Sequence, residues 1–467
     1  MDVMVKHLKK KEIAAYSLGL FGFQAIVGFL NSYQAEFYAA TMAADLALVG
    51  VLLLVVRVVS AAFDPVVGNL IERKNSKRGK LKPFIMLSII PLAVMTVLIF
   101  TEIPLKGPAL YGYIFITYLM WSLAMTLGDV PSQAIASVLT PNPTERTSVV
   151  SIANTLKSVG FAAAYVVVPI ACLLVPGGSR VFGYEGGKDT PINSTEYFVS
   201  SVIIGVLGCL LFSLIVFYSK ERVGYKTQRM SYSDMWRTLR DNKPLMMVIV
   251  SYFLGFGRQM AMGIQIQAAN VLLGGQNLIV VLGITTAVGS MISMIITPLL
   301  IKKIGERNTF LLLSIYGFVI SMITFFIGTE NKILMFSFLF LIGLQFGAVT
   351  LLPMIMAADC VDYYELKTGK RTEGTVYAVL SLTIKICLAM GTALGLLLLK
   401  ASKYNAQDIV FAEETKKLVY FGYTALPGIF SLLAAVPMLK YGIVGNKKLE
   451  IAMLLQERRE LATKSDK

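Results

Sequence analysis

Two acidic residues lie inside long apolar stretches of the chain, and each has a hydroxyl side chain close by in sequence. Asp64 follows Ser60 by four residues, and Asp129 follows Thr126 by three. In helices, each carboxylate would therefore share a face with its hydroxyl. Hard cations such as sodium prefer oxygen ligands, and a carboxyl group in a dry cavity can carry a proton near neutral pH. These four residues are candidates to bind H⁺ or Na⁺.

Basic residues inside apolar stretches give a second set of candidates. An ionisable side chain within a membrane costs a few kcal/mol or more, so it is expected to face a cavity or a partner. Arg57 lies seven residues before Asp64 and shares its face, and Lys385 lies in a later apolar stretch. The structural alternative is that these cations neutralise the acids and fix helix packing. Arg258 is also intramembrane, and the sequence suggests no partner for it.

The elements that must position these residues are membrane-spanning helices. The chain has 467 residues, of which 56% are hydrophobic and 15% charged, whereas soluble domains carry about 25% charged residues. This composition excludes a soluble enzyme, a disordered protein and a disulfide scaffold. Blocks of roughly 20 apolar residues predict transmembrane helices. Twelve spans are predicted, at 13–40, 46–71, 83–103, 108–140, 147–176, 197–219, 244–270, 277–301, 308–328, 333–361, 373–401 and 417–442.

The net charge of +15 comes from loops between these spans. Segment 72–82 has six basic residues and one acid, and 220–243 and 302–307 are also basic, whereas the intervening loops are neutral or slightly acidic. The positive-inside rule then places both termini in the cytoplasm and requires an even number of spans. A basic excess of this kind does not indicate nucleic-acid binding.

The polar stretch 220–243 divides the chain into two predicted six-helix halves, 1–219 and 244–442. A weak internal repeat supports this division, because basic residues follow the second span of each half and an Arg-Thr pair precedes or opens the fifth. We expect an all-α membrane protein with twelve transmembrane helices and the major facilitator fold, whose substrate site lies between the halves. Segment 443–467 is predicted to be a cytoplasmic tail, either solvated or on the membrane surface.

Catalytic and cofactor motifs are missing from the sequence. It contains neither HExxH nor a P-loop nor GxSxG, and its one histidine is His7. The four cysteines show no metal-ligand spacing and are interpreted as small apolar residues in helices. We therefore expect no enzyme activity, no cofactor and no resident metal. The expected partners are a small solute and the lipid bilayer, with no obligate protein partner.

Several motifs together resemble one transporter family. They are Arg57-VVSAAF-Asp64-Pro65-VVG followed by a basic polar loop, then Asp129-Val130-Pro131, then Pro143-Thr144-Glu145-Arg146-Thr147, and AADCVDYYELKTGKRTEG with Lys385. This series is similar to the glycoside–pentoside–hexuronide:cation symporters, the melibiose permease family. The resemblance implies that Asp64 and Thr126 belong to a cation site, with Lys385 near it. It further implies that Asp129 contacts sugar beside that site, and that Arg57 and Arg146 are structural or gating residues.

The sequence departs from the family pattern at the cation and sugar positions. Ser60 replaces the first aspartate of the second span, so the sodium cage lacks a carboxylate and proton coupling is favoured over sodium. Phe23-Gln24 replaces a Lys-Asp pair, Gln133 replaces a tryptophan, and Asn154 replaces an arginine. Gln24, Gln133, Asn154 and Asp129 are the predicted substrate-binding residues. Neutral amides can both donate to and accept from hydroxyl groups, which suits a sugar.

The predicted function is cation-coupled symport of a glycoside, pentoside or related small polar solute by alternating access in a bacterial inner membrane. Two alternatives remain open. The same fold could carry a lipid-like or anionic solute, or it could bind its ligand as a sensor without transport.

Overall fold

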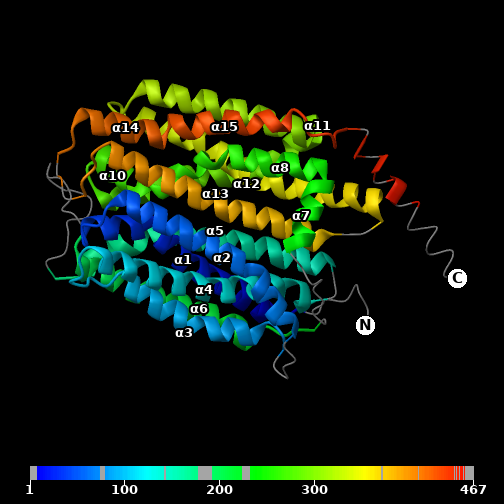
Figure 1. Ribbon diagram of the computed structural model, residues 1–467, viewed down its shortest axis with the longest axis horizontal. Helices are drawn as coiled ribbons and strands as arrows, with labels where there is room; N and C mark the ends of the chain where they lie inside the picture. Colours follow the sequence, from blue (N-terminus) through cyan, green and yellow to red (C-terminus); the bar gives the residue numbers. More distant parts are fainter. Residues whose placement is uncertain are drawn as a thin grey trace. The chain divides into compact units, whose positions relative to one another are not determined.

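The chain folds into helices throughout the part that is described. The computed structural model (Figure 1) describes residues 8–73, 79–140, 143–176, 192–222, 232–369, 372–406, 408, 410–445, 447–448, 450–451, 453–455 and 457. No strand occurs among these residues. The first six helices are α1 (Lys10–Ala40), α2 (Leu46–Arg73), α3 (Lys82–Ile99), α4 (Pro108–Leu139), α5 (Pro143–Leu174) and α6 (Ser194–Tyr218).

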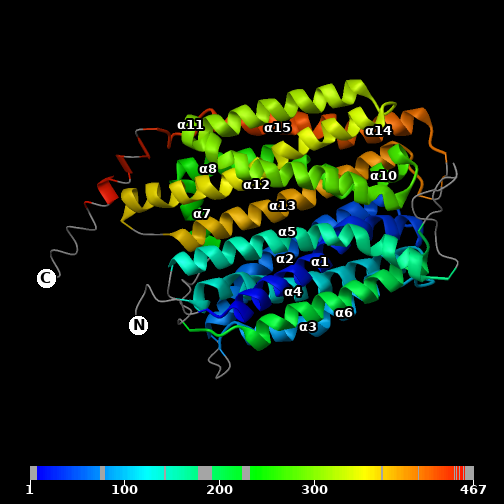
Figure 2. The same cartoon turned by 180° about the vertical axis from the view of Figure 1, so that it is seen from behind.

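The remaining helices are less regular. They are α7 (Tyr232–Asp241), α8 (Lys243–Leu254), η1 (Phe256–Gln259), α9 (Met260–Gly263), α10 (Gln265–Leu273), η2 (Gln276–Leu278), α11 (Ile279–Ile327), α12 (Lys332–Thr368), α13 (Glu373–Ala401), α14 (Glu413–Tyr423) and α15 (Ala425–Met438). Figure 2 shows α8, α11, α12 and α15 from behind. Helix α15 packs against α8 and η1.

The twelve predicted spans all have helical counterparts. Ten described helices are long and apolar enough to cross a membrane, and an eleventh span results if α8, η1 and α9, which bend by 50°, are counted together. Helix α11 is 49 residues long, and Gly305 breaks it with φ 80° and ψ 165°. This left-handed conformation favours glycine. Helix α11 therefore covers both the eighth and the ninth predicted span.

Helix α1 packs closely against α5 and α6 through glycines. A Cβ atom on Gly22 would lie 2.5 Å from the carbonyl oxygen of Gly208 in α6, and one on Gly160 in α5 would lie 2.3 Å from that of Phe21. Neither space admits a side chain. Small residues permit this close backbone approach, as is common in membrane helix pairs. As a result α1 is the most buried of the first six helices, with 72% of its most apolar segment buried.

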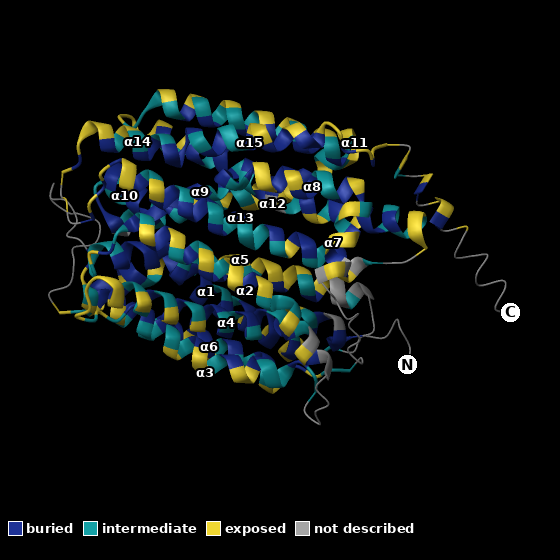
Figure 3. Cartoon of the chain, in the orientation of Figure 1, coloured by how far each residue is buried: buried dark blue, intermediate teal, exposed yellow. Residues whose placement is uncertain are grey.

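Many exposed residues are distributed along the helices (yellow in Figure 3), and large apolar side chains are among them. Examples are Ile90 of α3, Leu173 of α5 and Phe217 of α6, each more than 70% exposed. A water-soluble surface would not carry so many large apolar groups, whereas lipid chains accommodate them. The buried positions include all four cysteines, Cys172, Cys209, Cys360 and Cys387, and no disulfide joins them.

The chain divides into two compact units that do not follow the predicted halves. The first comprises 1–229, 262–283 and 392–419, and the second comprises 230–261, 284–391 and 420–467. The predicted boundaries at 219, 243 and 442 therefore stay a sequence-based prediction.

Some of the described residues after 442 pack into the protein, which differs from the expected solvated or membrane-surface tail. Ile451 and Leu455 are buried in the apolar core of the second unit. Lys448 donates to Glu306 at 2.5 Å and to Asp359 at 3.0 Å. Burial alone lowers the pKa of Lys448, but hydrogen bonds to these two acids and their charges outweigh it and raise the pKa above its ordinary value. The amphipathic pattern of this segment thus reflects docking onto the protein.

Candidate functional site

The two hydroxyl groups predicted to serve a cation site lie against each other. The Ser60 hydroxyl on α2 lies 3.1 Å from the Thr126 hydroxyl on α4, and it also donates to the carbonyl of Ser122 at 3.3 Å. Both side chains are buried, and Thr126 is fully enclosed. The structure therefore brings together residues that are 66 positions apart in sequence, next to the helix turn that carries Asp129.

Asp129 is a buried carboxylate with an amide donor. It is 7% exposed, and its Oδ2 accepts a hydrogen bond from Gln133 Nε2 at 2.9 Å. Gln133 is itself exposed. Two predicted substrate-binding residues are therefore paired one turn apart on α4. Asp64 is half-buried on α2, one turn beyond Ser60.

The other predicted substrate-binding residues lie on α1 and α5. Gln24 is half-buried and Asn154 is exposed, so both retain access from outside the packed core. Phe23, beside Gln24, is fully buried and packs on Phe212 of α6 with ring centroids 4.8 Å apart. Phe23 therefore belongs to the core. The roles of Gln24 and Asn154 stay predictions.

Arg57 connects three helices. Its Nε donates to the Tyr118 hydroxyl of α4 at 2.9 Å, and its guanidinium also bonds the Asn31 side chain of α1. Both partners are uncharged side chains. The expected structural or gating role of Arg57 stays a prediction.

Arg258 lies at the break in the seventh span, where η1 follows α8. It is 3% exposed, donates from Nε to the Gly255 carbonyl at 3.1 Å, and lies 5.7 Å from the centroid of the Tyr252 ring. The same carbonyl also accepts from the Arg258 backbone N–H at 3.0 Å, so both donors of Arg258 hold it at the helix break. This is the partner that the sequence did not reveal.

The predicted roles of Lys385 and Arg146 stay predictions. Lys385 is half-buried on α13 in the second unit, whereas Asp64 and Asp129 are in the first. The side chain of Arg146 lies outside the described residues. Its neighbour Glu145 is described and was not predicted to act.

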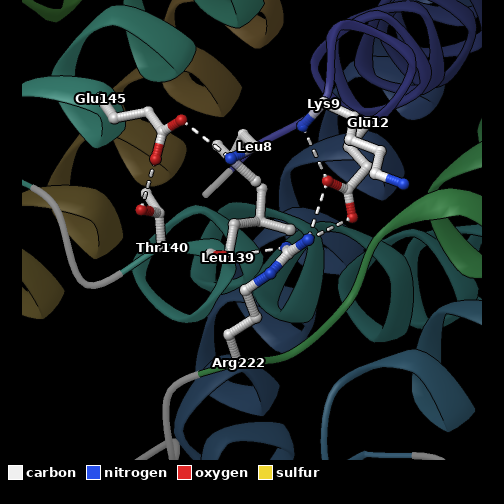
Figure 4. Close-up of polar contacts among 7 residues, drawn as sticks. All are labelled: Leu8, Lys9, Glu12, Leu139, Thr140, Glu145 and Arg222. Carbon is white, nitrogen blue, oxygen red and sulfur yellow. Dashed lines mark hydrogen bonds and ion pairs between the residues drawn. The ribbon is translucent and has the colours of Figure 1, made fainter. Parts of the chain in front are cut away.

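Glu145 belongs to a polar cluster at the start of α1 (Figure 4). It accepts from the Leu8 backbone at 2.9 Å and from the Thr140 hydroxyl at 2.6 Å. Beside it, Arg222 donates to both carboxylate oxygens of Glu12 at 2.9 Å and to the Leu139 carbonyl at 3.2 Å. The cluster ties the chain after α6 to the start of α1 and the end of α4.

A second unpredicted acid, Glu36, lies near the other end of α1. It is fully buried, and its Oε1 accepts from Gln276 Nε2 at 2.5 Å and from the Tyr404 hydroxyl at 2.7 Å. Tyr404 in turn accepts from Asn270 at 3.2 Å. With Gln267, which is also buried in this region, these residues form the Glu36 cluster, and all belong to the first unit. Its position within the first predicted span was the only sequence signal.

A family model described as MFS/sugar transport protein matches residues 15–444. The chain belongs to this family. The resemblance to glycoside–pentoside–hexuronide:cation symporters is thereby confirmed, and the family membership fits the all-helical fold with its many spans.

Relatives within this family cover nearly the whole chain. The inner membrane symporter YicJ of Escherichia coli (strain K12) is 26% identical over 449 residues, covering 96% of this chain and 94% of its own. The isoprimeverose transporter of Lactiplantibacillus pentosus is 28% identical over 456 residues, covering 94% and 89%. Among solved structures, the nucleoside transporter NupG aligns with a TM-score of 0.66 at 14% identity, covering 93% of this chain and all of that one. The last likeness shows the fold alone.

Proposed function

We propose that the chain is a proton-coupled symporter of a glycoside or pentoside, working by alternating access. The observation that carries this proposal is the paired arrangement on α2 and α4. A buried acid with an amide donor, Asp129 with Gln133, lies one turn from the Ser60–Thr126 hydroxyl pair. Solute recognition on α4 and ion binding on α2 would thus be linked through the contact between Ser60 and Thr126.

The polar groups suit a neutral sugar. Asp129 accepts hydrogen bonds, and Gln133, Gln24 and Asn154 can each donate and accept. A sugar hydroxyl needs both kinds of partner. The names of the relatives support the same solute class, since they include an isoprimeverose transporter and a putative glycoside/cation symporter, YagG of Escherichia coli.

The coupling ion is proposed to be a proton held by Asp64. A sodium site needs several oxygen ligands, but the Ser60 hydroxyl is already engaged by Thr126 and by a backbone carbonyl. A proton requires a single carboxyl group. Lys385 is proposed to take part in coupling, as the family resemblance implies.

The proposed location is the bacterial inner membrane with both termini in the cytoplasm. The basic loops support this orientation, since short cytoplasmic loops carry an excess of Lys and Arg. The start of α1 with the Glu12–Arg222 pair would then face the cytoplasm, and the Glu36 cluster would face the outside.

The test is solute-driven proton movement in liposomes that contain the purified protein. External pH is recorded while glycosides, pentosides and hexuronides are added singly, with and without sodium. We expect one class to cause alkalinisation, and we expect Asp64→Asn to abolish it while solute exchange across the membrane continues. Asp45→Asn, which removes a carboxylate between α1 and α2, serves as the control and should transport normally.

Three outcomes would change the proposal. Uptake that depends on sodium without proton movement would replace the proton with sodium. Uphill transport at the wild-type rate by Asp64→Asn would remove the coupling role of that residue. No response to any sugar, combined with uptake of sulfonated or acyl-bearing solutes, would favour the non-sugar alternative.

A further inference from the structure

Glu36 has a hydrogen-bonding environment made only of neutral groups. Its Oε1 has two donors, Gln276 and Tyr404, and both are uncharged side chains. Among the described residues, no cation lies within ion-pair distance of Glu36. One cation close in sequence to Tyr404, Lys400, is bound to Asp45 at 2.5 Å. Two titratable groups face Glu36 from neighbouring segments. They are the phenols of Tyr404, just after α13, and of Tyr197 in α6.

The second carboxyl oxygen has no described partner. Glu36 Oε2 is fully buried without a hydrogen bond, and so are both polar atoms of the Gln267 side chain on α10, which lies beside the carboxyl group. A protonated Oε2 is a hydrogen-bond donor, and the side-chain carbonyl of Gln267 is a buried acceptor that has no hydrogen bond of its own. An ionised carboxyl would instead place a full charge in a dry site, which costs several kcal/mol without a cation.

We propose that Glu36 binds a proton, and that the protonated residue holds α1 together with α10, η2 and the segment just after α13. In the arrangement seen here, Glu36 would hold a proton, accept from Tyr404 and Gln276, and donate to Gln267. This site is separate from Asp64 and Asp129. The protonation itself does not depend on the proposed function, and only the direction in which this end faces rests on it.

The position of the cluster couples the proton to closure. Glu36 is on α1, whereas its partners lie on α10, in η2 and just after α13, more than 200 residues later. Separation of these segments would let water reach the carboxyl group and make ionisation inexpensive. Because linkage is reciprocal, acid should favour the closed arrangement and alkaline pH should favour its opening. In the proposed orientation, a proton from the outside would close the outer end behind a bound solute.

The first test is infrared spectroscopy of the full-length protein in lipid, titrated from mildly acidic to alkaline pH. A protonated carboxylic acid has a carbonyl stretch that a carboxylate lacks. We expect a buried acid band near neutral pH that disappears in Glu36→Gln and remains in Asp45→Asn. An identical band in wild type and Glu36→Gln would overturn the proposal.

Gln267→Lys provides a second variant that retains Glu36. A cation beside the carboxyl group should stabilise its ionised form, so the acid band should be lost although the glutamate is present. Persistence of the band through the neutral range in this variant would place the proton on another residue, and would also overturn the proposal.

The second test measures closure by thiol labelling. Ala269 of α10 is fully buried, and the four native cysteines are buried as well, so Ala269→Cys gives a reporter in this region. The labelling rate with an impermeant maleimide is compared at each pH between Glu36 and Glu36→Gln versions, which cancels the intrinsic pH dependence of the thiol. We expect the labelling rate of the protein with Glu36, divided by that of the Glu36→Gln variant, to be near one in acid. This ratio should rise several-fold at alkaline pH. A ratio that does not change with pH would disprove the link to closure.

Discussion

Helix α1 carries a buried glutamate near each end, and the surroundings of the two differ. Glu12 is 6% exposed and forms a two-pronged ion pair with Arg222. Glu36 is fully buried and has only neutral donors. The ion pair holds the start of its helix in place, whereas an acid among neutral donors is suited to gain and lose a proton. A glutamate thus fixes the helix through an ion pair at one end of α1, and at the other end a glutamate is proposed to bind a proton.

The largest expected effect comes from removing the cation of Glu12. Arg222→Met would leave a buried charge without its partner, and since Arg222 is itself only 19% exposed, we expect a loss of about 2–3 kcal/mol in unfolding free energy. The measurement is a denaturant titration of the helical circular dichroism signal in detergent. The exposed Lys220 provides the control, because Lys220→Met should change stability by less than about 0.5 kcal/mol.

Neutralising both members of the pair should restore most of that stability. We expect the double variant Glu12→Gln with Arg222→Met to recover more than half of the loss of Arg222→Met alone, since the uncompensated charge is then gone. Glu36→Gln alone should stay within about 1 kcal/mol of wild type. If the double variant were as unstable as the single one, the Glu12 site would depend on packing and the contrast between the two glutamates would fail.

A smaller effect is expected from Tyr404→Phe, and its size distinguishes a neutral from a charged acceptor. Loss of a donor to a neutral carboxyl group should cost about 1 kcal/mol, whereas loss of a donor to a carboxylate should cost about 2–3 kcal/mol. Tyr33→Phe gives the matched value for a neutral acceptor, because the Tyr33 hydroxyl donates to the Tyr165 carbonyl at 2.9 Å. Tyr404→Phe also removes the acceptor of Asn270, so both variants are compared in an Asn270→Ala background. Equal losses are expected there, and a clearly larger loss in Tyr404→Phe would indicate an ionised Glu36.

The smallest effect concerns the exposed pair Asp45–Lys400. The hydrogen bond from Lys400 lowers the pKa of Asp45, burial opposes this weakly, and backbone donors add to the lowering. A lowered pKa means that the pair stabilises the protein above about pH 4 and that this contribution is lost as pH falls through the native pKa. Because both side chains are substantially exposed, Asp45→Asn should cost less than about 1 kcal/mol near neutral pH. A constant difference between wild type and variant down to strongly acidic pH would contradict this.

The spans were predictable because membrane helices must be long and apolar. The sixth span was expected at 197–219 and is Ser194–Tyr218, and the second was expected at 46–71 and is Leu46–Arg73. The break at Gly305 was also predicted, since it lies in the basic loop 302–307 expected between the eighth and ninth spans. The bend after Leu254 was not predicted, because it interrupts an apolar span and depends on backbone geometry that hydropathy does not register.

The candidate site was predictable only in part. Helical spacing paired Asp64 with Ser60 and Asp129 with Thr126, but it did not predict that the two hydroxyl groups would meet between α2 and α4. Glu36 was missed because its partners Gln276 and Tyr404 are 240 and 368 positions away. Intramembrane acids are therefore worth attention even where local spacing suggests no companion.

The docked C-terminal segment also bears on biosynthesis. Glu306 and Asp359 are translated well before Lys448, the cation that joins them. The second unit therefore reaches the membrane with this polar cluster incomplete, and completes it only after Lys448 has been synthesised. Stop codons placed between 443 and 448 should consequently yield chains that insert but are cleared by quality-control proteases.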